Sequence, residues 1–205
     1  MITLIIIVVT VGVSIYAMDN YTVKNNLMFN AYQIRHRKEW YRFFSSGLIH
    51  ADYMHLGFNM ISLYSFGAGV ENLYGYHFQE KGVLFFVLLY VSGLAMSSLY
   101  TYEKHKNDIY YNALGASGAV SSVIFAYIIL APKDTLRLMI LPGVDIPAYI
   151  FGAIFLGVEY YLGKRGNTNI GHDAHFWGAV YGIVFTIILK PMLGPAFIGQ
   201  IFGTR

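Results

Sequence analysis

The chain has 205 residues, of which 56% are hydrophobic and 12% are charged, and its formal net charge is +3. Soluble domains carry about 25% charged residues, so this composition, with a mean hydropathy of +0.50, indicates an integral membrane protein. Cysteine is absent, which excludes disulfides, thiolate metal sites and a cysteine nucleophile, and the charges form no basic, aromatic stripe of the kind that binds nucleic acid.

Six apolar segments are long enough to cross a bilayer, which takes about 20 residues for each helix. We expect these spans at about 2–18, 54–73, 82–100, 113–131, 146–163 and 174–190. The connections between them are mostly short, apart from the first. The sequence therefore predicts an all-α membrane protein in which residues 1–205 form one six-helix bundle, with no separate soluble domain.

The first segment, MITLIIIVVTVGVSIYAM, has the length of a secretory signal peptide. It lacks a basic n-region and an A-x-A cleavage site, and five more apolar segments follow it. We therefore expect it to be retained as a span.

The distribution of positive charge leaves the orientation in the membrane open. With a cytoplasmic N-terminus, five of the 14 Lys and Arg residues would lie inside and the other nine outside, whereas the positive-inside rule favours the reverse. Five of those nine fall in the long first connection, where a folded loop can use them for its own structure: Lys24, Arg35, Arg37, Lys38 and Arg42.

Polar side chains inside apolar segments are costly, and they usually face the bundle interior or a wet cavity. In the second segment, HADYMHLGFN places His55 and Asn59 four residues apart, on one face of a helix, and His50 precedes them. In the fourth segment, ALGASGAVSS places Ser117 between Gly115 and Gly118. Both clusters are candidate sites.

The sixth segment begins GHDAHFWGAVYG, in which Gly171, His175, Gly178 and Gly182 are spaced by four, three and four residues along one helical stripe. Small residues at such spacings are ordinary helix-packing faces, and each motif alone is more often packing than chemistry. A serine hydroxyl, however, needs a base within about 3 Å to accept its proton. Two helices lined with small residues could bring Ser117 and His175 that close.

The sequence favours a Ser–His dyad over a triad. Asp173 lies two residues from His175 and faces another way on a helix, and Glu159, near the end of the fifth segment, is expected to reach the membrane interface. His55, Asn59 and the backbone amide of Ser117 are candidate donors to an oxyanion.

The seven histidines raise the alternative of a metal or haem site. No HxxxH pair and no carboxylate and histidine ligand set lies on one helical face of the sequence, so we expect no metal. His77, His105 and His172 are expected to be hydrogen-bonded residues near the membrane interface.

The motifs on the second, fourth and sixth segments together resemble the rhomboid intramembrane serine proteases. WYRFF (40–44) is similar to the aromatic and arginine motif of the rhomboid first loop, and GAGVE (67–71) resembles the close of the second rhomboid helix. The resemblance implies a six-helix core with a long, partly membrane-embedded first loop, a short central fourth helix, a serine in a water-filled cavity, and no cofactor or metal.

The resemblance also implies a role for each matched residue. Ser117 would be the nucleophile and His175 the general base and acid. The oxyanion and substrate side would be formed by Asn59, His55, His50, which lines the cavity, and Gly115, which starts the GxSG turn. Structural roles fall to Gly118, Gly178, Gly182, Arg42 and Glu71. Many rhomboids carry an aromatic residue one turn after the serine, and this chain has Ser121 there. The imidazole would then be oriented by Trp177, Tyr181 or a hydrogen bond from Ser121.

The function predicted from these observations is intramembrane endopeptidase activity on transmembrane protein substrates in a lipid bilayer, by default a prokaryotic plasma membrane. Helices that unwind easily would be preferred, because an intact transmembrane helix hides its peptide bonds. The alternatives are a catalytically inactive rhomboid-like membrane binding protein and a small transporter. The transporter predicts repeat symmetry between the two halves, which the sequence does not have. The sequence makes no prediction of oligomeric state, substrate identity or pathway.

Overall fold

The structure is a computed structural model and describes residues 1–137, 145–166 and 170–203. It is mostly helical, with one two-stranded antiparallel sheet in which Leu136 pairs with Ile146. Its elements are α1 (Ile2–Met18), α2 (Tyr21–Leu27), α3 (Ala31–Arg37), α4 (Arg42–Ser45), the 3-10 helix η1 (Ser46–Leu48), α5 (Tyr53–Phe78), the 3-10 helix η2 (Gln79–Lys81), α6 (Gly82–His105), α7 (Ser117–Leu130), β1 (Thr135–Arg137), β2 (Asp145–Pro147), α8 (Ala148–Arg165), α9 (His172–Leu189) and α10 (Leu193–Phe202).

Each of the six predicted segments is helical, but several bounds differ. The fourth helix begins at Ser117, not near residue 113, because Gly115 has φ +119° and this conformation cannot continue a right-handed helix. The short helices of the first connection and α10 were not predicted.

The predicted count of six membrane spans is not confirmed. In the described residues, one helical stretch is both long and apolar enough to cross a membrane, Tyr53–His105, which joins α5 and α6 through η2. The pair α9 and α10, bent by 112°, is a second candidate if it is counted as one span. α1 and α7 are apolar but shorter.

The helix α7 lies at the centre of the bundle. It packs against α5, α6, α8, α9 and α10, and all of its residues except Ser117 and Tyr127 are buried. The large core side chains around it include Leu63, Phe86 and Phe125. In contrast, α1, α6 and α9 expose large apolar side chains such as Val8, Leu84 and Ile188, which suits a surface that faces lipid.

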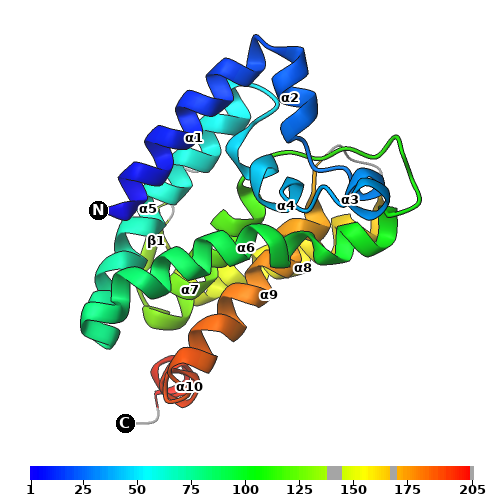
Figure 1. Ribbon diagram of the computed structural model, residues 1–205. Coiled ribbons are helices and arrows are strands. Elements are labelled where there is room, and N and C mark those ends of the chain that lie inside the picture. The colour runs from blue at the N-terminus through cyan, green and yellow to red at the C-terminus, as the bar shows by residue number, and fades with distance from the viewer. Residues whose placement is uncertain (138–144, 167–169, 204–205) are drawn as a thin grey trace.

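The first connection folds into α2, α3, α4 and η1, of which α3 and α4 lie beside α6 and α2 lies beside α1, while α1 lies along α5 (Figure 1). Asn20 and Asn30 cap the N-termini of α2 and α3, because their side-chain oxygens accept hydrogen bonds from the backbone N–H groups of Val23 and Gln33.

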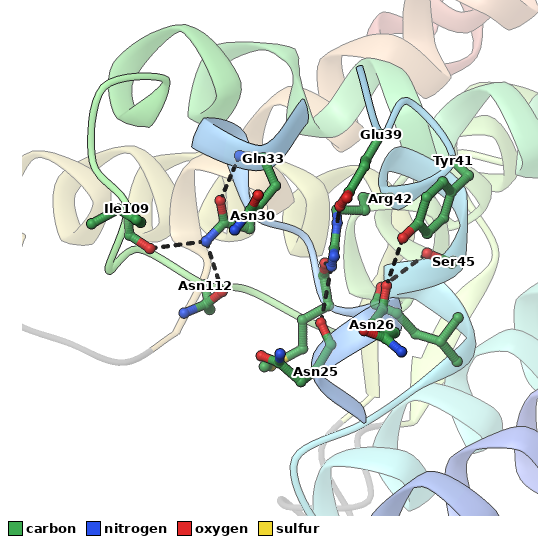
Figure 2. Close-up of polar contacts among 12 residues, drawn as sticks. Asn25, Asn26, Asn30, Gln33, Glu39, Tyr41, Arg42, Ser45, Ile109 and Asn112 are labelled. Carbon is green, nitrogen blue, oxygen red and sulfur yellow. Dashed lines mark hydrogen bonds and ion pairs between the residues drawn. The ribbon is translucent and has the colours of Figure 1, made fainter. Parts of the chain in front are cut away.

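The carbonyl groups at the end of α2 are bound by side chains from α4 and the residue before it (Figure 2). Arg42, which is buried, donates to the carbonyls of Asn25 at 2.9 Å and Met28 at 2.7 Å, and also pairs with Glu39. Ser45 donates to the carbonyl of Leu27 at 2.9 Å. The last carbonyls of a helix have no intrahelical partner, so these bonds complete α2 and fix α4 against it.

Glu71 ties α5 to the start of α1. Its carboxylate accepts hydrogen bonds from the backbone N–H groups of Ile2 at 2.8 Å and Thr3 at 3.1 Å, and from the Thr3 hydroxyl at 2.8 Å. A carboxylate is favourable at this position because the N-terminus of a helix carries partial positive charge.

Candidate active site

The site is built around the turn that precedes α7. Gly115 has a positive φ of +119°, and a Cβ added to it would lie 2.7 Å from Cε1 of the His55 ring. Glycine is therefore required twice, once for the backbone conformation and once for the approach of His55. The turn points α7 into the bundle with Ser117 as its first residue.

The first loop holds this turn by backbone hydrogen bonds. Phe29 and Ala113 exchange two of them, of 2.9 and 3.0 Å, and the N–H of Gly115 donates to the carbonyl of Ser46 at 2.9 Å. Asn30 donates from its side-chain amide to the Asn112 side chain at 3.1 Å and to the carbonyl of Ile109 at 3.0 Å (Figure 2). The position of Ser117 thus depends on the fold of the first loop.

His50 is the next contact along the same turn. Its Nε2 accepts from the N–H of Ala116 at 3.3 Å, and its Nδ1 lies 2.9 Å from the Ser14 hydroxyl, which donates to the carbonyl of Leu48 at 3.0 Å. His50 is 1% exposed, and burial lowers its pKa from 6.5 to about 4, with a smaller contribution from His55 in the same direction and an opposing one from Asp52.

The expectation that His50 lines the cavity on the oxyanion side therefore needs correction. Both ring nitrogens are already bound, and the side chain is buried, so His50 supports the turn instead of facing a substrate. Its partners, Ser14 and Ala116, come from distant parts of the chain, and local sequence gives no sign of them.

The structure brings Ser117 and His175 together, with His175 Nε2 2.6 Å from Ser117 Oγ. At this distance the two atoms form a hydrogen bond. Both side chains are partly exposed, so the pair is accessible from outside the bundle.

Glycine makes the close approach of α7 and α9 possible. A Cβ on Gly178 would lie 2.1 Å from the carbonyl oxygen of Gly118, and a Cβ on Gly182 would lie 2.1 Å from that of Ser122. On the other side of α7, a Cβ on Gly118 would lie 2.3 Å from the hydroxyl oxygen of Ser97 on α6. At Gly178 and Gly182 no other residue fits without moving backbone atoms of α7, and at Gly118 the side chain of Ser97 would have to move.

Glu159 on α8 is a member of the site that sequence reasoning missed. Its Oε1 lies 3.2 Å from Nδ1 of His175, and its Oε2 lies 2.6 Å from Nδ1 of His172. Both Glu159 and His172 are buried. The expectation that no carboxylate orients His175 is wrong, because Glu159 is buried against the ring and does not point out of the bundle. His172 makes the hydrogen bond expected of it, with Glu159 as its partner.

A signal for Glu159 was present in the sequence. An ionisable residue within an apolar segment is a site candidate by default, and Glu159 shares one helical face with Ala148 and Gly152, the two other buried residues of α8. This face is the one that α8 buries.

Trp177 and Tyr181 were expected to orient the His175 ring in place of an aromatic residue at position 121, but both contact other residues. The Trp177 ring pairs with Tyr100, and the Tyr181 hydroxyl lies 2.6 Å from the hydroxyl of Ser92. The ring of His175 has Phe155 of α8 as a neighbour, at 6.5 Å between centroids, together with the Glu159 carboxylate.

His55 and Asn59 lie on one face of α5, as predicted. The His55 ring packs against Gly115 and, at 5.0 Å between centroids, against His50. Asn59 is buried and uses one of its two amide donors on the carbonyl of His55 at 2.9 Å. The second donor of an asparagine amide is available for another acceptor.

The other two histidines expected near an interface lie at helix ends. His77, at the end of α5, accepts from Lys190 at 3.1 Å, and His105, at the end of α6, stacks on Tyr111 with 3.6 Å between ring centroids.

Glu159, His172 and His175 form a group whose ligand-type atoms all lie within 4.8 Å of one another. No metal was expected because no ligand set lies on a single helical face. This group instead combines Glu159 of α8 with His172 and His175 of α9. Such a group could hold a divalent cation, but the two hydrogen bonds already account for the short distances between its members.

Comparison with known proteins adds an independent observation. The family model of the Rhomboid domain matches residues 37–192. RHOMBOID-like protein 12, mitochondrial, of Arabidopsis thaliana is 28% identical over 155 residues, which are 68% of this chain and 44% of that protein. The Presenilin-associated rhomboid-like protein, mitochondrial, of Mus musculus is 30% identical over 135 residues, 65% of this chain and 34% of that protein. Rhomboid protease AarA of Providencia stuartii is 27% identical over 178 residues, 79% of this chain and 61% of that protein.

The chain spans less than half the length of the first two of these relatives and less than two thirds of the third. The family model nevertheless covers most of the chain, including the first loop from residue 37 and the helices α4 to α9. The chain therefore belongs to the rhomboid family, whose members are integral membrane proteins.

Proposed function

We propose that this chain is a serine endopeptidase that hydrolyses peptide bonds of membrane protein substrates within the bilayer. The observation that carries the proposal is the 2.6 Å contact between Ser117 Oγ and His175 Nε2. This contact is the geometry that a serine needs for activation by a base.

In the first half of the reaction, Ser117 Oγ attacks the carbonyl carbon of the scissile bond while His175 Nε2 takes the hydroxyl proton. The tetrahedral intermediate then collapses, the C–N bond breaks, and His175 returns the proton to the leaving amine. In the second half, His175 takes a proton from water, the resulting hydroxide attacks the acyl ester, and the proton passes back to Ser117 as the carboxylic acid leaves.

The oxyanion of the intermediate needs hydrogen-bond donors. Ser117 is the first residue of α7, where the backbone N–H has no intrahelical partner and the helix dipole favours negative charge. The free donor of Asn59 and the His55 ring, which packs on Gly115, are the side-chain candidates. Each donor of this kind typically contributes about 3 to 4 kcal/mol to transition-state stabilisation.

The substrates would be transmembrane segments that unwind easily, with Gly or Pro near the cut, since only unwinding exposes a peptide bond to Ser117. We place the whole chain in a single rhomboid-like membrane domain of six spans. A prokaryotic plasma membrane stays a prediction, because the matched relatives include mitochondrial proteins and a protease of a bacterium.

Two other functions compete with this one. A rhomboid-like membrane binding protein without catalysis has no use for a serine and a histidine in hydrogen-bond contact, and a transporter has no use for an activated serine.

Labelling with a serine-directed phosphonate, followed by mass spectrometry, separates these functions. We expect one adduct, on Ser117, in the wild-type protein and none in His175→Ala. A correctly folded wild-type protein without an adduct would favour the binding protein or the transporter.

A further inference from the structure

The carboxylate of Glu159 is buried beside the catalytic pair, and a Ser–His dyad alone gives it no role. It has 11% side-chain exposure and offers one oxygen to His175 and the other to His172. We propose, resting on the function proposed above, that Glu159 is a positioning residue for His175 and that His172 in turn holds Glu159. The reacting unit is then a chain of four residues, Ser117, His175, Glu159 and His172.

The contact with Glu159 determines which nitrogen of His175 carries the ring proton. An ionised carboxylate only accepts hydrogen bonds, so Nδ1 of His175, at 3.2 Å from Oε1, carries the proton in this contact. Nε2 of a neutral imidazole is then the unprotonated nitrogen and faces the Ser117 hydroxyl at 2.6 Å. The other tautomer would set a lone pair against the carboxylate and leave no base for Ser117.

Glu159 also stabilises the positive charge that forms on His175 during the reaction. When His175 takes the proton of Ser117, both of its ring nitrogens become donors, and the ring becomes a cation. Glu159 then lies beside an imidazolium, and because its carboxylate is largely buried, the attraction between the opposite charges is stronger than in water. The carboxylate stabilises this cation without taking the proton itself.

His172 binds the other oxygen of the Glu159 carboxylate. Its Nδ1 donates to Oε2 of Glu159 at 2.6 Å, the shorter of the two contacts. Among the described residues its buried Nε2 has no hydrogen-bond partner, which suits a neutral ring whose single proton is on Nδ1. His172 thus fixes the carboxylate through the oxygen that His175 does not use.

This arrangement accounts for the departure at Ser121. A ring that lacks an aromatic neighbour on α7 can be oriented from α8 instead, and Glu159 and Phe155 are one turn apart on that helix. The orientation of His175 then depends on α8 and α9, not on the residue that follows Ser117 by one turn.

The kinetic test uses Glu159→Gln, Glu159→Asp and Glu159→Ala. We expect Glu159→Gln and Glu159→Ala to lower kcat by about tenfold or more with KM within about twofold, because the orienting charge acts on the reacting group and not on substrate binding. Glu159→Asp should recover part of the loss. Glu71→Gln is the matched control, since Glu71 also accepts hydrogen bonds but at α1, and its kcat should stay near the wild-type value in the folded protein.

His172 is tested with a pair of variants. His172→Gln retains an N–H donor for Glu159, whereas His172→Phe retains the size of the ring but has no donor. We expect His172→Phe to lower kcat more than His172→Gln does. Equal kcat values for the two variants would show that His172 does not act through this hydrogen bond.

Nitrogen NMR of the wild-type protein provides a readout that does not depend on cleavage. With 15N-labelled histidine, and with His175→Asn to assign the signal, His175 should be protonated on Nδ1, and this preference should be lost in Glu159→Ala. An Nε2-protonated His175 in the wild type, or an unchanged kcat in Glu159→Gln, would overturn the proposal. So would loss of activity in EDTA that Zn²⁺ restores, because the same three groups would then hold a cation. If the wild type does not cleave, the proposed function fails while the NMR result still decides the role of Glu159.

Discussion

The first loop (residues 19–52) and the contact between α7 and α9 are both tightly packed, but they are held by opposite kinds of residue. In the first loop, long polar side chains such as Arg42 and Asn30 bind backbone carbonyls and amides that the short helices leave without partners. Between α7 and α9, Gly178 and Gly182 contribute no side chain at all, and two backbones touch.

The difference shows how the two regions share the placement of the site. The loop fixes the turn of residues 113–117 because Phe29 exchanges hydrogen bonds with Ala113, and Ser46 and His50 accept them from Gly115 and Ala116. The loop therefore sets where Ser117 lies. The glycine contact sets how near α9 comes, and so the distance from His175 to Ser117. Loss of either region should separate the pair, but the two losses should differ in size and in their dependence on pH.

The largest effect on activity should follow from a side chain in the glycine contact. A Cβ in Gly178→Ala or Gly182→Ala would lie 2.1 Å from a backbone carbonyl oxygen of α7, so the helices must move apart, at a cost of about 1 to 3 kcal/mol. A displacement of about 1 Å at the site can lower turnover about 100-fold. We expect at least that loss in reporter cleavage.

The matched control for the glycine contact is Gly157→Ala on α8, where a Cβ would have no neighbouring atom within 4 Å. This variant should retain activity and stability. Gly178→Ala and Gly182→Ala proteins as active as Gly157→Ala would contradict the role given to the contact.

The largest effect on stability should come from Arg42→Ala. Removing a buried charge that is bound on several sides leaves Glu39 and the carbonyls of Asn25 and Met28 without their partner. Such a loss typically costs about 3 to 5 kcal/mol, which corresponds to a fall in Tm on the order of 10 °C for a chain of this size.

Two further arginine variants sharpen this result. Arg42→Lys should recover only part of the loss, because lysine lacks the planar fork of donors. Arg37→Ala, at an exposed arginine of α3, should change the free energy of unfolding by less than about 0.5 kcal/mol. Similar Tm values for Arg42→Ala and Arg37→Ala would refute the assignment of Arg42 to the loop structure.

The smallest effect concerns His50, which joins the first loop to the turn. Its pKa is lowered from 6.5 to about 4 in the folded protein, so the unfolded chain binds a proton more readily between these values. The contribution to stability is complete above about pH 6.5 and is lost as the pH falls toward 4, by at most about 3 kcal/mol.

Thermal unfolding in detergent across this pH range, compared between the wild type and His50→Gln, isolates the contribution of His50. The wild type should lose more stability on acidification than the variant does. Parallel Tm curves for the two proteins would show that His50 is not held neutral by the fold.

The sequence predicted those features of the site that show as a pattern of residues along a single helix. The apolar segments located the six helices, and the glycine spacings of α9 with the small residues around Ser117 identified the pair that now lies at 2.6 Å.

What the sequence did not predict depends on contacts between helices. Glu159 was judged by its position along α8, but its role follows from how α8 packs on α9, which brings it to His172 and His175. His50 was assigned to a cavity by resemblance, whereas its burial follows from Ser14 on α1 and Ala116 before α7. Neither the contacts of Glu159 nor those of His50 can be predicted from a local pattern of residues.

The central claim is that Ser117 and His175 together perform peptide hydrolysis. The most direct measurement is cleavage of a single-span reporter by the purified protein in proteoliposomes, with mass spectrometry of the products, for the wild type, Ser117→Ala and His175→Ala. We predict that the wild type cuts at one position within or beside the reporter helix, and that both folded variants retain less than about a tenth of this rate, since a poor nucleophile without its base leaves no covalent route. Undiminished cleavage in either variant, or no cleavage by the wild type of any span that contains Gly or Pro, would contradict the claim.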